Sequence, residues 1–161
     1  MQVRLATLAD AESIRAIYNH QVTSSTVTFD MEPRSLDQQL EWLRRHQGAH
    51  PAVVAVEDGR VLAFASVSAY RDRPAYSTTV EDSVYVDPSA HRRGIGRTLL
   101  TELIRLATDH GFHVMVAHSA ADNTASIALH RACGFDLVGV ERQVGRKFGR
   151  WVDVVILQRI L

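Results

Sequence analysis

The sequence predicts an α/β protein with a mixed, largely antiparallel sheet and about four helices. The first observation is a hairpin signal, in which apolar runs at residues 52–56 and 61–70 flank the dipeptide Asp58-Gly59. Asp-Gly between two apolar runs favours a tight turn that joins antiparallel strands. A third strand, at residues 78–86, follows with no helix between. Three successive strands contradict the regular βαβ alternation of a flavodoxin-like parallel sheet.

The second observation is a long amphipathic helix at residues 94–110, whose apolar side chains recur at helical spacing and which Gly111 ends. Residues 112–117 follow as a nearly continuous apolar run, which is typical of a strand buried on both faces. Another helix is expected over residues 123–133, with Gly134 at its close. This half of the chain therefore supplies helices that pack on the faces of the sheet.

The N-terminal third supplies one strand and two helices. Residues 2–6 alternate as a strand, and Thr7 or Asp10 can cap the helix that follows. Residues 21–29 are rich in β-branched and hydroxyl side chains, which predicts an irregular or extended loop. The next helix runs from Ser35 to Gly48 and opens with the capping-box sequence Ser-Leu-Asp-Gln.

The C-terminal part is expected to add two strands, near residues 135–140 and 151–160, and residues 71–74 predict a polar turn earlier in the chain. No linker, repeat or low-complexity tract interrupts these elements. At roughly 100–200 residues per domain, a chain of 161 residues is expected to be a single domain over residues 1–161.

Composition argues against several function classes. The 18 Lys and Arg balance the 18 Asp and Glu, so no overall basic footprint for nucleic acid exists. Cys133 is the only cysteine, which excludes an intrachain disulfide and favours a reducing cytoplasm. No apolar run approaches the ~20 residues of a membrane span, and the N-terminus lacks the apolar core of a signal peptide. We therefore expect a cytoplasmic protein that contacts neither membrane nor nucleic acid.

The eight histidines raise the possibility of a metal site. His46 and His50 are four residues apart but Gly48 lies between them, and His110 and His113 flank Gly111. Neither pair has a cysteine or clustered carboxylates at ligand spacing, so no metal is expected.

The segment between residues 84 and 100 carries the densest functional signal. A strand leads into a loop with Arg92, Arg93, Gly94 and Gly96, and then into the long helix. Glycines allow close approach of the backbone, and a helix N-terminus attracts anions, so the segment predicts a phosphate-binding loop. A glycine-rich helix start with solvated arginines explains the same residues without a ligand.

Two familiar phosphate motifs do not fit this loop. A Walker loop ends in Gly-Lys-Ser/Thr, whereas this chain has Gly96-Arg97-Thr98. The dinucleotide fingerprint requires a third glycine where Leu99 stands. Neither ATP nor NAD is favoured.

The sequence His-Arg-Arg-Gly-Ile-Gly-Arg-Thr at residues 91–98 resembles the acyl-CoA pyrophosphate loop of the GNAT acetyltransferase superfamily, although His91 stands where that pattern has Gln or Arg. A second superfamily feature is similar at residues 123–126 and 128–135. The whole chain further resembles the phosphinothricin and methionine-sulfone acetyltransferase branch. The segments that carry this resemblance are residues 17–19, 73–76, 79–86 and 144–151.

The resemblance implies a GNAT fold and acetyl-CoA as co-substrate. It assigns these residues to the cofactor: Val84, Tyr85, Val86, Arg92, Arg93, Gly94, Ile95, Gly96, Arg97, Thr98, Asn123 and Ser126. It also implies that the main-chain N–H of Val86 polarises the acetyl carbonyl. Helix capping alone explains Asn123 equally well.

Two side chains are expected to handle protons. The resemblance selects Glu81 as the base that deprotonates the amine, since a carboxylate in a partly dry cleft can serve as a base. The adjacent Asp82 is expected on the opposite face of the strand. His130 stands where many GNAT members have a tyrosine that protonates the CoA thiolate, and imidazole can take that role. A histidine packed against the sheet is the alternative for His130.

The acceptor site is expected to involve paired arginines, because a guanidinium suits a carboxylate, phosphinate or sulfone oxygen. The expected substrate-binding residues are Phe29, Tyr70, Arg71, Asp72, Arg73, Glu81, Asp82 and Ser83. A solvated ion-pair cluster explains the two arginines equally well. Asp72 departs from the proline often found between them in the family.

Together these features predict an N-acetyltransferase for the α-amine of phosphinothricin, methionine sulfoximine or methionine sulfone, acting by direct transfer. The resemblance also implies a homodimer, with Phe148 and Trp151 as candidate interface anchors. Two alternatives stay open. The acceptor could be another amine, such as a polyamine, an antibiotic or a protein N-terminus, or the protein could be a non-catalytic acyl-CoA sensor.

Overall fold

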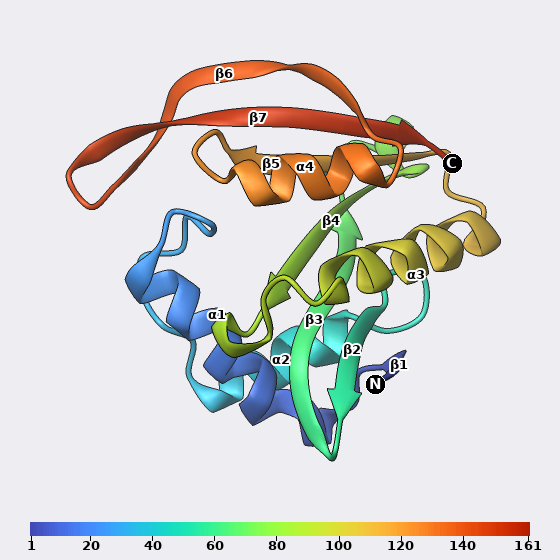
Figure 1. The fold of residues 1–161 in the computed structure, drawn as a ribbon. Helices are drawn as coiled ribbons and strands as arrows, with labels where there is room; N and C mark the ends of the chain where they lie inside the picture. Colours follow the sequence, from blue (N-terminus) through green and yellow to red (C-terminus); the bar gives the residue numbers. More distant parts are fainter.

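The computed structural model describes residues 1–161 and contains one seven-stranded sheet with helices on both faces (Figure 1). The strand order is β1-β2-β3-β4-β5-β7-β6, and every neighbouring pair except β4–β5 is antiparallel. The prediction of a mixed, largely antiparallel sheet is therefore confirmed. The strands are β1 (Gln2–Leu5), β2 (Ala52–Glu57), β3 (Arg60–Ala69), β4 (Thr79–Val86), β5 (Val114–Ala120), β6 (Asp136–Lys147) and β7 (Arg150–Ile160).

Four α-helices accompany the sheet, as predicted. They are α1 (Ala11–Ser24), α2 (Leu36–Arg45), α3 (Ile95–His110) and α4 (Thr124–Ala132). Short 3₁₀ turns η1 (Leu8–Asp10), η2 (Pro74–Tyr76) and η3 (Pro88–Ala90) connect the elements. Helices α1 and α2 cover one face of the sheet, and α3 covers the other, with α4 against β5 and β7 (Figure 1). None of the four helices has the length and hydropathy of a membrane span.

The core has two parts, one on each face of the sheet. On the α3 side, Leu99, Leu103 and Met115 are fully buried in a cluster of 20 residues. On the α1 side, Ile14 and Phe64 belong to a cluster of nine residues. Alternate residues of the central strands therefore contribute to opposite clusters, as the period of two requires.

The N-terminal elements differ from the sequence-based prediction at two boundaries. Helix α1 continues to Ser24, so the expected loop at residues 21–29 is wrong for its first four positions. Val22 is 1% exposed, and its burial outweighs the weak helix propensity of the surrounding β-branched residues. The Ser35 capping box is confirmed, but α2 ends at Arg45, before Gly48.

The C-terminal hairpin is longer than predicted. Strand β6 extends to Lys147, and only a short turn at Phe148 and Gly149, both with positive φ, separates it from β7. The β6–β7 register shifts between Leu137 and Gly139 and again between Glu141 and Gly145. These irregularities disrupt the alternation by which a strand is recognised in a sequence, so residues 141–147 escaped prediction.

The β4–β5 pair is the feature that positions the site. It is the one parallel pair, and it joins only Thr79–Glu81 to Val114–Val116. Beyond these residues the two strands separate, and β5, β7 and β6 form a half of the sheet that turns away from β4 (Figure 1). An opening therefore lies between the two strands, where residues 83–85 of β4 and 117–119 of β5 line a cavity instead of pairing with each other.

Candidate active site

The last residues of β4 have a free backbone edge facing this opening. The N–H of Asp87 donates to the carbonyl oxygen of Leu62 at 2.9 Å, on the β3 side. Because successive N–H groups of a strand point to alternate edges, those of Val84 and Val86 point away from β3 and into the opening. Two aligned backbone donors are thus available to a ligand that lies along β4.

A cavity of about 530 Å³ lies at this free edge and extends to the starts of α3 and α4. It is lined by Gln21, Val27, Val84, Tyr85, Val86, Ala90, His91, Arg92, Gly94, Ile95, Gly96, Arg97, Asn123, Ala125, Ser126 and Leu129. Half of these residues are hydrophobic, and the charged ones gather at the α3 end. The cavity suits a long ligand with an apolar arm and an anionic end.

The start of α3 forms the positive end of that cavity. The chain turns sharply at Arg92 and Gly94, whose φ angles are 60° and 76°. The first N–H groups of the helix have no acceptor within it, and the helix dipole favours negative charge there. Arg97 adds a second guanidinium. A side chain at Gly96 would approach Leu129 Cδ2 to 3.3 Å, so glycine keeps the cavity open at this point.

Ten of the twelve predicted cofactor residues line this cavity; Arg93 and Thr98 do not. The Arg93 guanidinium instead forms an ion pair with Glu57 at 2.7 Å. The Thr98 hydroxyl donates to the carbonyl oxygen of Gly94 at 3.3 Å, which stabilises the first turn of α3. Asn123 caps α4 by accepting from the N–H of Ser126 at 3.1 Å.

Asp82 and His130 form a buried pair on the α3 side of β4. The His130 Nε2 atom lies 3.0 Å from Asp82 Oδ2, and its Nδ1 donates to the carbonyl oxygen of Ser126 at 2.7 Å. Asp82 Oδ1 is buried without a hydrogen-bond partner in the protein. Burial raises the pKa of Asp82. Burial is also the largest influence on the pKa of His130 and lowers it, but the hydrogen bond and charge of Asp82 and the hydrogen bond to Ser126 together give a net increase. The pair therefore holds a proton firmly.

Glu81 lies on the opposite face, as the alternation of the strand predicted. Its Oε1 atom lies 2.9 Å from Nδ1 of His118 on β5. The Tyr70 ring stacks parallel to the His118 ring, with centroids 6.3 Å apart. The Arg71 guanidinium lies 4.7 Å from the Tyr70 ring centroid. A carboxylate, an imidazole, a phenol and a guanidinium thus lie in sequence from Glu81 to Arg71, and the Glu81–His118 hydrogen bond can carry a proton.

Comparisons with known proteins identify this arrangement. The model of the acetyltransferase (GNAT) family matches residues 14–135. The chain belongs to the GNAT family. It is 40% identical to a phosphinothricin N-acetyltransferase of Alcaligenes faecalis over 99% of this chain and 82% of that protein. It is also 40% identical to an L-methionine sulfoximine/L-methionine sulfone acetyltransferase of Salmonella typhimurium, over 98% of this chain and 93% of the relative.

A solved structure agrees. The phosphinothricin acetyltransferase of Sinorhizobium meliloti in complex with AcCoA superimposes with a TM-score of 0.94 at 40% identity, covering 99% of this chain and 88% of the other. The expected family is therefore confirmed, and this GNAT protein is an acyltransferase.

The predicted acceptor residues of this GNAT chain divide into two groups. Tyr70, Arg71 and Glu81 converge near His118, while Asp82 and Ser83 line a small cavity of about 40 Å³ beside the large one. The exposed Asp72 and Arg73 make no side-chain hydrogen bond or ion pair within the protein.

Phe29 lies on the loop between α1 and α2 and packs on the C-terminal hairpin. A side chain at Gly145 would approach Phe29 Cζ to 2.6 Å, so the ring packs closely against bare backbone. The buried Lys147 holds the same loop by donating to the carbonyl oxygen of Thr28 at 2.7 Å. These contacts fix the loop against the half of the sheet that turns away from β4.

Sequence reasoning missed several residues around the opening. His118 is the most important, because no motif marks it and its contact with Glu81 depends on the β4–β5 register. His91 departs from the family pattern, and its Nε2 atom lies 3.1 Å from the carbonyl oxygen of Val86. Gln21, Val27, Ala90, Ala125 and Leu129 also line the large cavity and carry no sequence signal.

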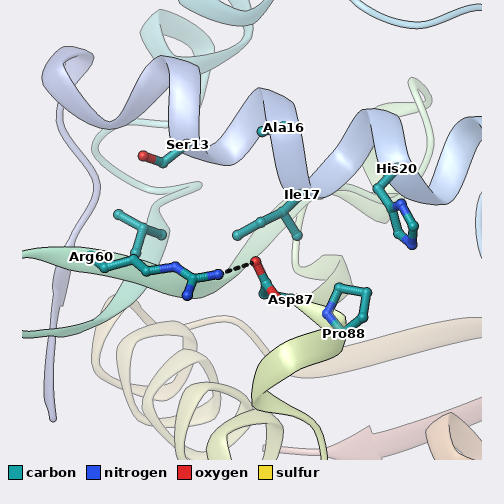
Figure 2. Close-up of a pocket in the computed structure, with 8 residues that line it drawn as sticks. Ser13, Ala16, Ile17, His20, Arg60, Asp87 and Pro88 are labelled. Atoms are coloured by element: carbon teal, nitrogen blue, oxygen red, sulfur yellow. Dashed lines mark hydrogen bonds and ion pairs between the residues drawn. The ribbon is translucent and has the colours of Figure 1, made fainter.

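A second cavity, of about 370 Å³, lies between α1 and the loop after β4 (Figure 2). Arg60 and Asp87 form an ion pair at 2.9 Å across it, and His20 lies at one end. None of the predicted site residues lines it. No group of three or more His, Cys, Asp and Glu side chains in the protein is arranged to hold a metal ion.

Proposed function

We propose that this protein transfers the acetyl group of acetyl-CoA to the α-amine of a small amino-acid analogue, namely phosphinothricin, methionine sulfoximine or methionine sulfone. The observation that carries the proposal is the meeting, at one opening in the sheet, of a free backbone edge, an anion-binding helix start and a proton-accepting group. The names of the relatives with about 40% identity over nearly the whole chain support the substrate class.

Acetyl-CoA would lie in the large cavity. Arg92, Arg97 and the first N–H groups of α3 would bind its pyrophosphate. The pantetheine arm would run along β4 and reach Asn123 and Ser126 at the start of α4. The cavity suits acetyl-CoA because its apolar part matches the pantetheine arm and its positive end matches the pyrophosphate.

The acetyl carbonyl would accept a hydrogen bond from the free edge of β4, which stabilises the developing oxyanion. At about 3.4 Å per residue, Val86 lies about 17 Å along the strand from Glu81, and Val84 about 10 Å. A base and the attacked carbonyl must both reach one amine, so the shorter distance favours Val84 for this contact. Val86 would then bind further along the arm.

Direct transfer in a ternary complex requires a neutral amine and a protonated leaving group. The hydrogen-bonded group formed by Glu81 and its polar neighbours would remove the proton from the ammonium form of the acceptor. The amine nitrogen then attacks the thioester carbon, the carbon–sulfur bond breaks, and the thiolate takes up a proton. His130 would supply this proton, because it lines, together with Asp82, the small cavity of about 40 Å³ beside the cofactor cavity.

The acceptor's acidic group would contact Arg71, whose guanidinium lies over Tyr70 and near the Tyr76 hydroxyl. A bidentate guanidinium suits a carboxylate or a phosphinate. Arg71→Ala should therefore raise KM for these acceptors more than Arg73→Ala does. A larger increase in KM for Arg73→Ala than for Arg71→Ala, or no increase for either, would favour a cationic acceptor such as a polyamine.

A homodimer is part of the proposal. Phe148 and Trp151 are 56% and 60% exposed on the β6–β7 hairpin, which is long and lies at the edge of the sheet. Exposed aromatics on an edge hairpin suit an isologous contact. The free, buried Cys133 fits the reducing cytoplasm proposed for the protein. Analytical ultracentrifugation of the wild type and Trp151→Glu would test the dimer.

The decisive experiment measures acetyl-CoA-dependent thiol release with phosphinothricin, methionine sulfoximine, methionine sulfone and spermidine. Turnover with the first three and none with spermidine would support the proposal. Turnover with spermidine alone would show that the acceptor is a polyamine and not an amino-acid analogue. Binding of CoA without thiol release from any acceptor would favour a non-catalytic sensor.

A further inference from the structure

His118 lies at the point where β4 and β5 separate. On β5 it lies two residues after Val116, the last residue paired with β4. The Glu81 side chain contacts its imidazole at 2.9 Å. His118, but not Glu81, lines the small cavity of about 40 Å³ together with Ser83 and Val84. Of the two groups, the imidazole therefore shares a cavity with the free edge of β4.

The contact with Glu81 determines which nitrogen of His118 can act. A carboxylate accepts hydrogen bonds, so the Nδ1 atom that faces Glu81 carries a hydrogen. In the neutral ring the Nε2 atom then has a free lone pair. No protein group lies within hydrogen-bond distance of Nε2, and the side chain is 26% exposed. A basic nitrogen is thus held in one orientation and left accessible.

Glu81 is less suited to take a proton itself. Its side chain is 35% exposed, which keeps the charged form hydrated, and the hydrogen bond from His118 occupies one of its oxygens. An imidazole titrates near neutral pH, where a general base is most effective.

We propose that Nε2 of His118 accepts the proton of the acceptor ammonium group, and that Glu81 is the positioning residue that orients the ring and stabilises its charge. This inference rests on the proposed acetyl transfer. One ammonium proton passes to Nε2 and then to water, and the neutral amine attacks the thioester carbon. A second proton leaves the nitrogen after the attack, the carbon–sulfur bond breaks, and the thiolate is protonated to CoA.

The charged groups around His118 determine its titration. The hydrogen bond that His118 donates to Glu81 is the largest influence on the pKa of His118 and raises it. The charges of Glu81 and of Glu141 on β6 also raise this pKa, while burial and Arg71 lower it, for a net increase. The base acts only in its neutral form. The pH profile of kcat/KM should therefore rise with pH through the titration of His118, and loss of the Glu81 charge should move this limb to lower pH.

The test compares His118→Gln, His118→Ala and Glu81→Gln in thiol release with methionine sulfone. Gln keeps volume and a donor toward Glu81 but has no basic nitrogen. We expect both His118 variants to lose about 10²–10⁴-fold in kcat and to lose the acidic limb of the profile. Added imidazole should partly restore His118→Ala, which a structural role would not allow. Glu81→Gln should keep more activity than either, with its acidic limb at lower pH.

His20→Gln is the matched control, because the His20 side chain lies by the separate cavity on the α1 side and makes no hydrogen bond. It should keep the wild-type profile. Near wild-type kcat in His118→Gln together with complete loss in Glu81→Gln would overturn the proposal and leave Glu81 as the base.

A measurement without substrate separates this inference from the proposed function. Nitrogen-15 NMR of the histidine rings should show His118 with hydrogen on Nδ1, and its pKa should fall in Glu81→Gln. Hydrogen on Nε2, or a titration that Glu81→Gln does not change, would overturn the proposal even if acetylation occurs. If the wild type releases no thiol with any acceptor, acetyl transfer fails as the function while the NMR result still decides the orientation of the base.

Discussion

The Nε2 atom of His130 lies 3.0 Å from Oδ2 of Asp82, while its Nδ1 donates to the carbonyl oxygen of Ser126. Since a carbonyl oxygen only accepts, Nδ1 carries a hydrogen in every state of the pair. The second contact then needs one more proton, either on Nε2 or on the Asp82 carboxyl. The Asp82–His130 pair of the folded protein therefore retains a proton that the same two side chains release more easily when they are apart.

This proton makes stability depend on pH. The folded state binds it more tightly than the unfolded state, so the free energy of unfolding of the wild type should fall as pH rises above about 6.5. In Asp82→Asn the amide can donate to a neutral imidazole, which removes the extra proton. Urea unfolding from about pH 6 to about pH 9 should show a downward slope in the wild type and a flatter one in Asp82→Asn. Parallel slopes would contradict the assignment.

The C-terminal hairpin offers a test of how the loop after α1 is held. A methyl group at Gly145 would collide with the Phe29 ring, whereas one at Gly139 of the same strand would meet nothing within 4 Å. Gly145→Ala should therefore lower the free energy of unfolding by about 1–3 kcal/mol. Gly139→Ala is the matched control and should have little effect. Equal changes in urea midpoint would show that Phe29 does not depend on the bare backbone.

Whether a feature could be predicted depends on how far apart in the sequence its interacting residues lie. Local patterns worked: the Asp58-Gly59 turn, the Ser35 capping box and the opposite faces of Glu81 and Asp82 all depend on neighbours within a few residues. The Glu81–His118 contact spans 37 positions and exists because of the β4–β5 register. No local pattern encodes that register.

Irregular segments were not predicted, for a related reason. The second half of β6 was missed because its register shifts twice, so its side chains do not alternate between faces. The lining of the large cavity by Gln21 and Val27 depends on how far α1 extends and where the following loop packs. Burial of Val22 decides that extension, and burial is a tertiary property that propensity does not reveal.

Gly96, which lines the large cavity, gives a prediction in which the binding of acetyl-CoA and the stability of the protein change independently. Gly96 lies in the first turn of α3, where alanine is a better helix former by about 1 kcal/mol. A side chain there would enter the space beside Leu129 and Val86. Gly96→Val should raise KM for acetyl-CoA about tenfold or more, a loss of at least about 1.4 kcal/mol in binding, without a comparable loss in stability. Unchanged KM with normal folding would place the cofactor elsewhere.

The ion pair between Arg4 and Asp10 should stabilise the start of the fold in a pH-dependent way. Asp10 is buried and accepts from both Arg4 terminal nitrogens, at 2.7 and 2.8 Å, and from the N–H of Thr7. The hydrogen bonds from Arg4 hold the pKa of Asp10 below its ordinary value, against the opposing effect of burial. Its stabilisation is therefore present above about pH 4 and is lost as pH falls through the lowered pKa.

The variant Asp10→Asn tests this window. At neutral pH the loss of charge-assisted hydrogen bonds should lower the free energy of unfolding by about 1.5–3 kcal/mol. As pH falls through the lowered pKa of Asp10, the wild-type carboxyl becomes protonated and resembles the amide, so the difference between the two proteins should shrink. Glu12→Gln is the control, because its ion pair with Arg15 is exposed and contributes little. A difference for Asp10→Asn that stays constant down to low pH would mean that its effect is steric and that the Arg4 contact is not its source.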